Sequence, residues 1–138
     1  MTLRSILRRS AAGAYAVIGV VAAFAPARVP GVFGGTAGTP EARTEVRAVY
    51  AGIPLALAGS LAAASGSAPG DDAVLRTVGA ASAGMAAARL AGCVAERRLA
   101  PWPTGAFLVL EAALAVALRV ATRAGTAGGP LQGPAASL

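Results

Sequence analysis

A single acid lies inside one of the most apolar stretches of the chain, at Glu111 in FLVLEAALAVAL. A charged side chain at the centre of a bilayer costs roughly 2.5–3.5 kcal/mol on insertion scales. Glu111 should therefore face a protein interior, carry a proton or pair with a cation. Arg89 is the cation that an antiparallel neighbouring helix would bring to a similar depth. The two side chains could form a site that responds to protons or cations, or a structural ion pair that fixes helix register.

A second polar group stands where another apolar segment begins, in EVRAVYAGIPLAL. Arg47 and Tyr50 are three residues apart, so they share one face of an α-helix, and we expect that face to point at Arg89 and Glu111. Together with Glu45 they predict a polar, ligand-binding pocket. The alternative is that Glu45 and Arg47 are interfacial and that Tyr50 belongs to an aromatic belt or to the core.

Two helix-weakening residues, Gly52 and Pro54, follow directly in the same stretch. Proline removes a backbone donor and its ring collides with the preceding turn. We expect a kink there, which would free backbone carbonyls inside the bundle and widen the predicted pocket.

Composition identifies the environment in which these residues act. Of 138 residues, 56% are hydrophobic and only 13% are charged, and the mean hydropathy is +0.65. This charged share is about half that of a typical soluble protein, so there is too little charge to cover a soluble domain. The net charge of +6 comes from arginines at the ends of apolar segments. Because a nucleic-acid surface needs a basic patch with aromatic side chains on a soluble fold, we expect no nucleic-acid partner.

Metal and thiol chemistry have little support in the sequence. The chain contains one cysteine, Cys93, and no histidine. Zinc sites, haem–histidine sites and Cys–His catalysis all need more of these residues. We therefore expect no metal site, no cofactor and no catalytic residue. The abundance of Ala, Gly and Arg is typical of a bacterial chain from a GC-rich genome.

Four segments are long and apolar enough to cross about 30 Å of hydrocarbon, which takes roughly 20 helical residues. The sequence thus predicts an all-α fold, a four-helix transmembrane bundle in up-down-up-down order, since short links join antiparallel neighbours. Residues 1–125 should form this membrane domain, and the Gly/Pro-rich tail 126–138 should be disordered. The expected helices cover residues 8–27, 40–66, 72–97 and 102–123, and Thr39-Pro40-Glu41 has the pattern of a helix start.

The expected location is the cell (inner) membrane, with several passes. The first segment could instead be a cleaved signal peptide, because it has a basic start and small residues near Ala27. Six arginines fall on each side of the predicted bundle, so their count does not set the orientation. Arg4, Arg8 and Arg9 precede the first uncharged run, which begins at Ser10, and they favour a cytoplasmic N-terminus.

The chain resembles a family of small bacterial four-helix membrane proteins, domain-of-unknown-function family 4345. The residues that carry the resemblance are FGG at 33–35, EVRAVYAGIPLA at 45–56, Arg89-Leu90 and Glu111. The likeness extends over about residues 10–123. It implies a four-helix integral membrane protein, and it implies neither an activity nor a catalytic residue. The layout is also similar, to a lesser extent, to DoxX-like membrane proteins.

These observations favour a non-enzymatic membrane protein and leave enzymatic activity open. Its polar pocket would bind a small or lipid-like ligand, or the chain would be a subunit of a larger membrane assembly. Expected partners are the lipid bilayer, other membrane proteins or further copies of the chain. One alternative is a component of a proton-coupled transporter that uses Glu111. Another is a quinone-linked membrane redox partner, which needs an aromatic-lined pocket.

Overall fold

The computed structural model describes residues 1–64, 68 and 70–126, and all regular structure in that part is helical. The predicted all-α fold with four helices able to span a membrane is confirmed. The up-down-up-down order across a membrane stays a prediction, and the tail beyond Thr126 lies outside the described residues. The elements are α1 (Leu3–Phe24), η1 (Pro30–Phe33), α2 (Pro40–Val46), η2 (Arg47–Gly52), α3 (Ile53–Ala63), α4 (Asp71–Ala95), η3 (Pro101–Gly105) and α5 (Ala106–Thr126).

Three of these elements form one continuous helical stretch, because α2, η2 and α3 follow each other without a break from Pro40 to Ala63. The predicted start of this stretch is confirmed. The side chain of Thr39 accepts a hydrogen bond from the backbone N–H of Ala42 at 3.1 Å, and Pro40 occupies the first helical position, where no backbone donor is needed.

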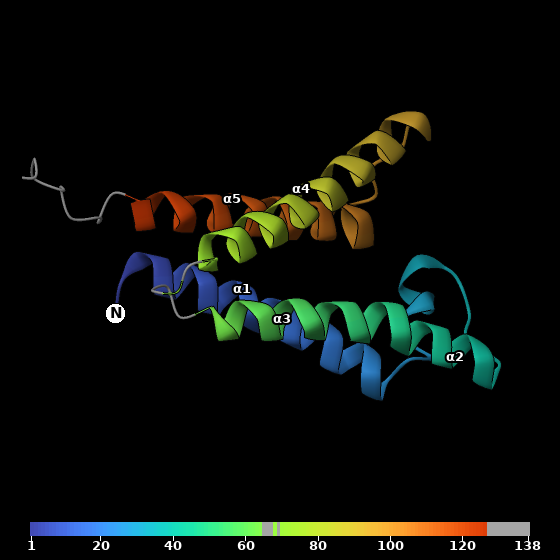
Figure 1. The fold of residues 1–138 in the computed structure, drawn as a ribbon. Coiled ribbons are helices and arrows are strands. Elements are labelled where there is room, and N and C mark those ends of the chain that lie inside the picture. Colours follow the sequence, from blue (N-terminus) through green and yellow to red (C-terminus); the bar gives the residue numbers. More distant parts are fainter. Residues whose placement is uncertain (65–67, 69, 127–138) are drawn as a thin grey trace, which may run out of the picture.

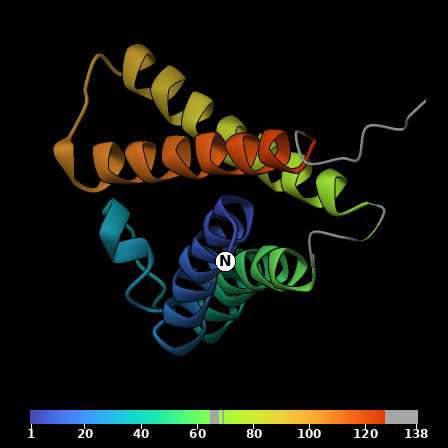
Figure 2. The ribbon, with the colours of Figure 1, turned by 90° about the vertical axis from the view of Figure 1, so that its left-hand side faces the viewer.

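The helices are arranged as two pairs, α1 beside α3 and α4 beside α5 (Figure 1). The pairs meet mainly where α1 packs on α5. Seen from the end at which the N-terminus lies, α4 and α5 cross at a clear angle, whereas α1 and α3 run close together (Figure 2). The α4–α5 pair therefore has faces that the α1–α3 pair does not cover.

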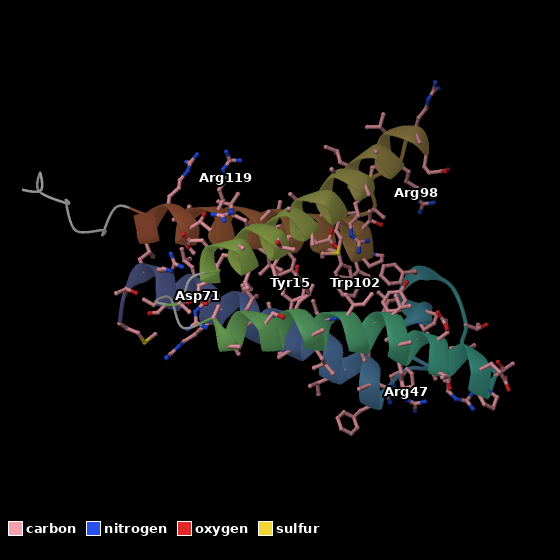
Figure 3. The ribbon with its side chains drawn as sticks, viewed as in Figure 1. Tyr15, Arg47, Asp71, Arg98, Trp102 and Arg119 are labelled. Atoms are coloured by element: carbon pink, nitrogen blue, oxygen red, sulfur yellow. The ribbon has the colours of Figure 1, made fainter. Side chains whose placement is uncertain are left out.

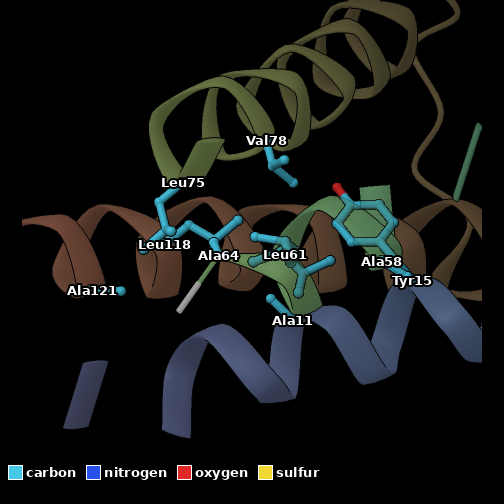
Figure 4. Close-up of a cluster of buried hydrophobic side chains, with 10 residues drawn as sticks. Ala11, Tyr15, Ala58, Leu61, Ala64, Leu75, Val78, Leu118 and Ala121 are labelled. Atoms are coloured by element: carbon cyan, nitrogen blue, oxygen red, sulfur yellow. The ribbon is translucent and has the colours of Figure 1, made fainter. Parts of the chain in front are cut away.

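The hydrophobic core is small and lies where all four long helices meet (Figure 4). Leu61, Leu75 and Leu118 are fully buried and come from α3, α4 and α5. Tyr15 points from α1 towards α4, and its hydroxyl lies 2.7 Å from Ser82 Oγ. Ser82 in turn donates to the carbonyl of Val78 at 2.9 Å, so these buried polar groups are satisfied.

Close helix approach depends on two glycines. A side chain on Gly19 of α1 would stand 2.7 Å from Leu55 Cγ of α3, and one on Gly79 of α4 would stand 3.3 Å from Leu118 Cβ of α5. Because small residues let helix backbones approach each other, these positions set the spacing within both pairs.

Most of the apolar surface faces outward. In the most hydrophobic windows of the four helical stretches, only 17–28% of residues are buried inside the molecule. Val17, Val109 and Val116 are each more than 60% exposed. Exposed apolar surface on this scale marks a partner or a membrane, and the helix lengths fit a bilayer. The chain is thus a multi-pass membrane protein, while the membrane in which it lies and the orientation of its N-terminus stay predictions.

Candidate functional site

The acid and the cation singled out by the sequence form an ion pair. Arg89 Nε of α4 lies 2.8 Å from Glu111 Oε2 of α5 and donates a hydrogen bond to it. The Glu111 side chain is 7% exposed and that of Arg89 is 28% exposed. The carboxylate is therefore buried between the helices, as an acid in a membrane helix requires, and the guanidinium reaches it from the side.

Aromatic rings cover the same guanidinium. Its central carbon lies 5.1 Å from the centre of the Phe107 ring and 5.9 Å from that of Phe33. The two rings are 5.7 Å apart, and Trp102 lies 6.2 Å from Phe107. A cation over ring faces is attracted by their quadrupoles, more strongly where water is excluded. Three of the six aromatic residues of the chain thus gather beside Arg89.

The FGG motif explains how Phe33 reaches this position from a loop. Phe33 ends the short helix η1, and Gly34 follows with φ of +81°, in the left-handed region that suits glycine. The N–H of Gly35 then donates to the carbonyl of Pro30 at 2.8 Å. This closed turn holds the loop between α1 and α2 against the start of α5.

A hollow of about 450 Å³ opens beside Arg89, where α4 ends and the chain turns towards α5. Its charged lining residues are Arg89, Glu96 and Arg98. Arg98 and Trp102 lie at the end of the molecule opposite the N-terminus (Figure 3). Among the described residues, no hydrogen bond from Nη1 or Nη2 of Arg89 is present, so these donors can serve a ligand.

The hollow beside Arg89 has no aromatic side chain in its described lining. A bound quinone would rest on aromatic rings, and the nearby rings are stacked on Arg89 instead. Within residues 1–64, 68 and 70–126, no group of three His, Cys, Asp or Glu side chains could hold a metal ion.

The structure does not bring the other three predicted site residues to the ion pair. Glu45, Arg47 and Tyr50 are exposed, and Arg47 Nε donates to the carbonyl of Ala23 at 3.2 Å. Figure 3 shows Arg47 on the side of the α1–α3 pair that faces away from α4 and α5. Between described residues, no hydrogen bond, ion pair or ring contact joins these three to the pair. Their role in ligand binding stays a prediction.

For Arg47 and Tyr50, the structure also differs from the expected geometry in helix type. Residues 47–52 form a π-helix, whose hydrogen bonds run from residue i to residue i+5. Residues three apart, such as Arg47 and Tyr50, therefore do not line up as they would in an α-helix. Pro54 stands two residues after the end of the π-helix, and in an α-helix its ring would collide with the carbonyl of the residue four positions earlier. The π-helix is wider than an α-helix, and it lies at the position where the sequence predicted a kink.

A second polar cluster lies at the opposite end, and sequence reasoning did not identify it. Arg8 is 6% exposed and its Nη1 donates to the backbone carbonyls of Leu61 and Ala62, at the end of α3. Arg4 Nη2 lies 2.6 Å from Asp72 Oδ1 at the start of α4. From the sequence, Arg4 and Arg8 indicated only the orientation of the N-terminus.

A helical pattern could have revealed Arg8. The buried residues of α1 recur at intervals of three and four, which is the spacing of one helix face. They are Arg8, Ala11, Tyr15, Gly19 and Ala22. Arg8 is the one charged residue in this buried set, which makes it a candidate for a buried hydrogen-bonding role. The aromatic cover of Arg89 had no comparable signal, since Phe33 and Phe107 are far apart in the sequence.

A comparison with family models adds to this geometry. The model described as a domain of unknown function (DUF4345) matches residues 3–122, which is most of the chain. The expected likeness to that family is confirmed, while the likeness to DoxX-like proteins stays a prediction. No curated protein and no solved structure matches the chain.

Proposed function

The chain belongs to the family of the domain of unknown function DUF4345, a membership that assigns no activity, and from the geometry around Arg89 we propose that it is a non-enzymatic membrane protein that binds a small lipid-like ligand. The hollow beside Arg89 is the proposed site. A carboxylate head group is the ligand chemistry that fits best. The observation that carries the proposal is the arrangement of Arg89, which is anchored on one edge and open on the other.

Anchoring prepares the arginine for binding. Its Nε is bonded to Glu111, and the rings of Phe33 and Phe107 lie over its guanidinium. A guanidinium fixed in this way loses little side-chain entropy when it binds, and its planar fork suits a carboxylate. Arg98 adds a second positive charge to the same lining, where Glu96 contributes the one negative charge.

The surroundings suit an apolar tail. Leu90 and Val94, on the last turns of α4, are 53% and 70% exposed. In a bilayer these side chains contact lipid, so a chain-like ligand can leave its head in the hollow and extend along α4. A soluble anion would gain nothing from these apolar contacts.

Trp102 provides a direct test, because it is the only tryptophan and lies beside the site. A fatty acid brominated along its chain, added to the protein in detergent micelles, should quench Trp102 fluorescence in a saturable manner. The methyl ester of the same fatty acid should quench about tenfold less effectively, since it lacks the charge that pairs with arginine.

Neighbouring arginines give a matched pair of variants. Arg98→Gln should weaken saturable quenching about fivefold, while Arg97→Gln should leave it unchanged, since Arg97 is exposed and outside the lining. Equal quenching by acid and ester, or equal effects of the two variants, would overturn the proposal. Proton movement in vesicles that requires Glu111, with no saturable quenching, would favour the transporter alternative instead.

A further inference from the structure

A second hollow lies at the other end of the α4–α5 pair and takes no part in the proposed site. It holds about 510 Å³ and is formed between α4 and α5. Its floor is made of small side chains such as Gly79, Ala80 and Ala83 of α4 and Ala115 of α5. The two helices cross at an angle (Figure 2). Because these lining residues are also small, a groove remains between the helices.

The rim of this groove is strongly basic. Three arginines line it, Arg76 from α4 and Arg119 and Arg123 from α5, and no acid is among the described residues of its lining. Within the described part of the chain, Arg76 and Arg119 form no ion pair and donate no side-chain hydrogen bond. Arg119 lies towards the end of the molecule at which the N-terminus is found (Figure 3).

Arg76 and Arg119 lie near the ends of their helices, where lipid head groups are expected. Arg76 is five residues into α4 and Arg119 is seven residues before the end of α5. At 1.5 Å per residue these positions lie about 8 and 10 Å from the helix ends, within reach of the interface for a long side chain. Ala83 lies about 10 Å further along α4 than Arg76, so the groove runs from the interface into the hydrocarbon.

We propose that this groove binds an anionic phospholipid. Its phosphate would pair with Arg76 and Arg119, and one acyl chain would lie on Gly79, Ala80 and Ala83. Basic pockets between transmembrane helices are known to hold anionic head groups, and arginine forms paired hydrogen bonds with phosphate. A zwitterionic lipid would fit the same apolar floor but would bring its own positive charge to a basic rim.

This site is independent of the proposed function. The two hollows share no lining residue and lie at opposite ends of the α4–α5 pair. The fatty-acid experiment reports on Trp102 and Arg98, and a failure there leaves the phospholipid groove untouched.

Lipid titration of the whole protein in detergent, followed by native mass spectrometry, tests the proposal. Phosphatidylglycerol should bind more tightly than phosphatidylcholine with the same acyl chains. Arg76→Gln/Arg119→Gln should weaken phosphatidylglycerol binding about 25-fold, or about fivefold for each arginine, and should weaken phosphatidylcholine binding much less, because its choline already offsets the phosphate charge. The matched control is Arg9→Gln/Arg28→Gln, which removes two exposed arginines outside the groove and should change neither binding constant.

A second variant tests the apolar floor without touching the charges. Ala83→Phe places a ring in the groove from an exposed position, so it should weaken binding of phosphatidylglycerol about tenfold while the arginines stay in place. The proposal is overturned if both lipids bind equally, or if inorganic phosphate competes as well as the lipid. It is also overturned if the groove is covered by a second copy of the chain when lipid is removed.

Discussion

At one end of the bundle Arg8 is 6% exposed and donates to two backbone carbonyls, whereas at the other end Arg89 donates to a side chain and is 28% exposed. Both arginines lie inside helical stretches able to span a membrane, and both have found partners. They differ in the kind of partner and in how many guanidinium donors remain available to a ligand.

The partners of Arg8 explain why its role is structural. The last carbonyls of a helix have no partner within the helix, and where they are buried in the protein they need one. Leu61 and Ala62 are in the last turn of α3, so Arg8 satisfies them and places a positive charge at the negative end of that helix. Such backbone partners cannot move away when a ligand arrives.

Arg89 is held differently. Its one hydrogen-bonding partner within the described chain is a carboxylate, and the two rings over it hold the cation without using its remaining donors. A hollow lies along the open edge. Burial of the charge therefore does not separate the two arginines, whereas the unused donors next to open space do, and it is on these donors that the proposed ligand site at Arg89 rests.

The largest effect should come from removing Arg8. Arg8→Met keeps the length and apolar stem of the side chain but removes the hydrogen bonds to the carbonyls of Leu61 and Ala62, and it should lower the free energy of unfolding by about 3 kcal/mol. Unfolding by sodium dodecyl sulfate in mixed micelles measures this loss. Arg9→Met is the matched control, because Arg9 is exposed and should change stability little. If the two variants cost the same, the structural half of the comparison is wrong.

An intermediate effect should come from the ion pair. Glu111→Gln leaves Arg89 without its counter-charge and should cost about 2 kcal/mol, less than a fully buried pair because Arg89 is part exposed. Arg89→Gln in the same chain should recover at least half of that loss, since two neutral amides can bond to each other. The same unfolding titration gives both values. A double variant that is no more stable than Glu111→Gln would mean that the pair has no structural role.

The fold was largely predictable because the length and hydropathy of successive segments along the chain identify the membrane helices. Uncharged runs of about 20 residues, interrupted at proline, glycine and charges, predict membrane helices regardless of how they pack. The helix start at Thr39-Pro40 was predicted from the residues preferred at that position. The pairing of Arg89 with Glu111 was predicted by counting residues along two antiparallel helices. These features were all found in the structure.

The rest of the site depended on three-dimensional details that no local pattern carries. The face shared by Arg47 and Tyr50 was worked out with α-helical spacing, and the π-helix before Pro54 changed it. Phe33 covers Arg89 only because a loop folds back, and Arg8 finds the end of α3 only because α1 and α3 pack closely at Gly19.

The smallest effect, about 1 kcal/mol, should come from the aromatic cover. Phe33→Leu keeps an apolar side chain but removes one ring over the Arg89 guanidinium and its contact with Phe107. Phe24→Leu is the matched control, because Phe24 is 86% exposed at the end of α1 and has no ring contact within the described residues. Phe33→Leu should also weaken quenching of Trp102 by the brominated fatty acid, about threefold, since a less firmly held arginine loses more entropy on binding. Full quenching with reduced stability would show that the rings stabilise the fold without preparing Arg89 for a ligand. The role of Arg89 would then be structural, like that of Arg8.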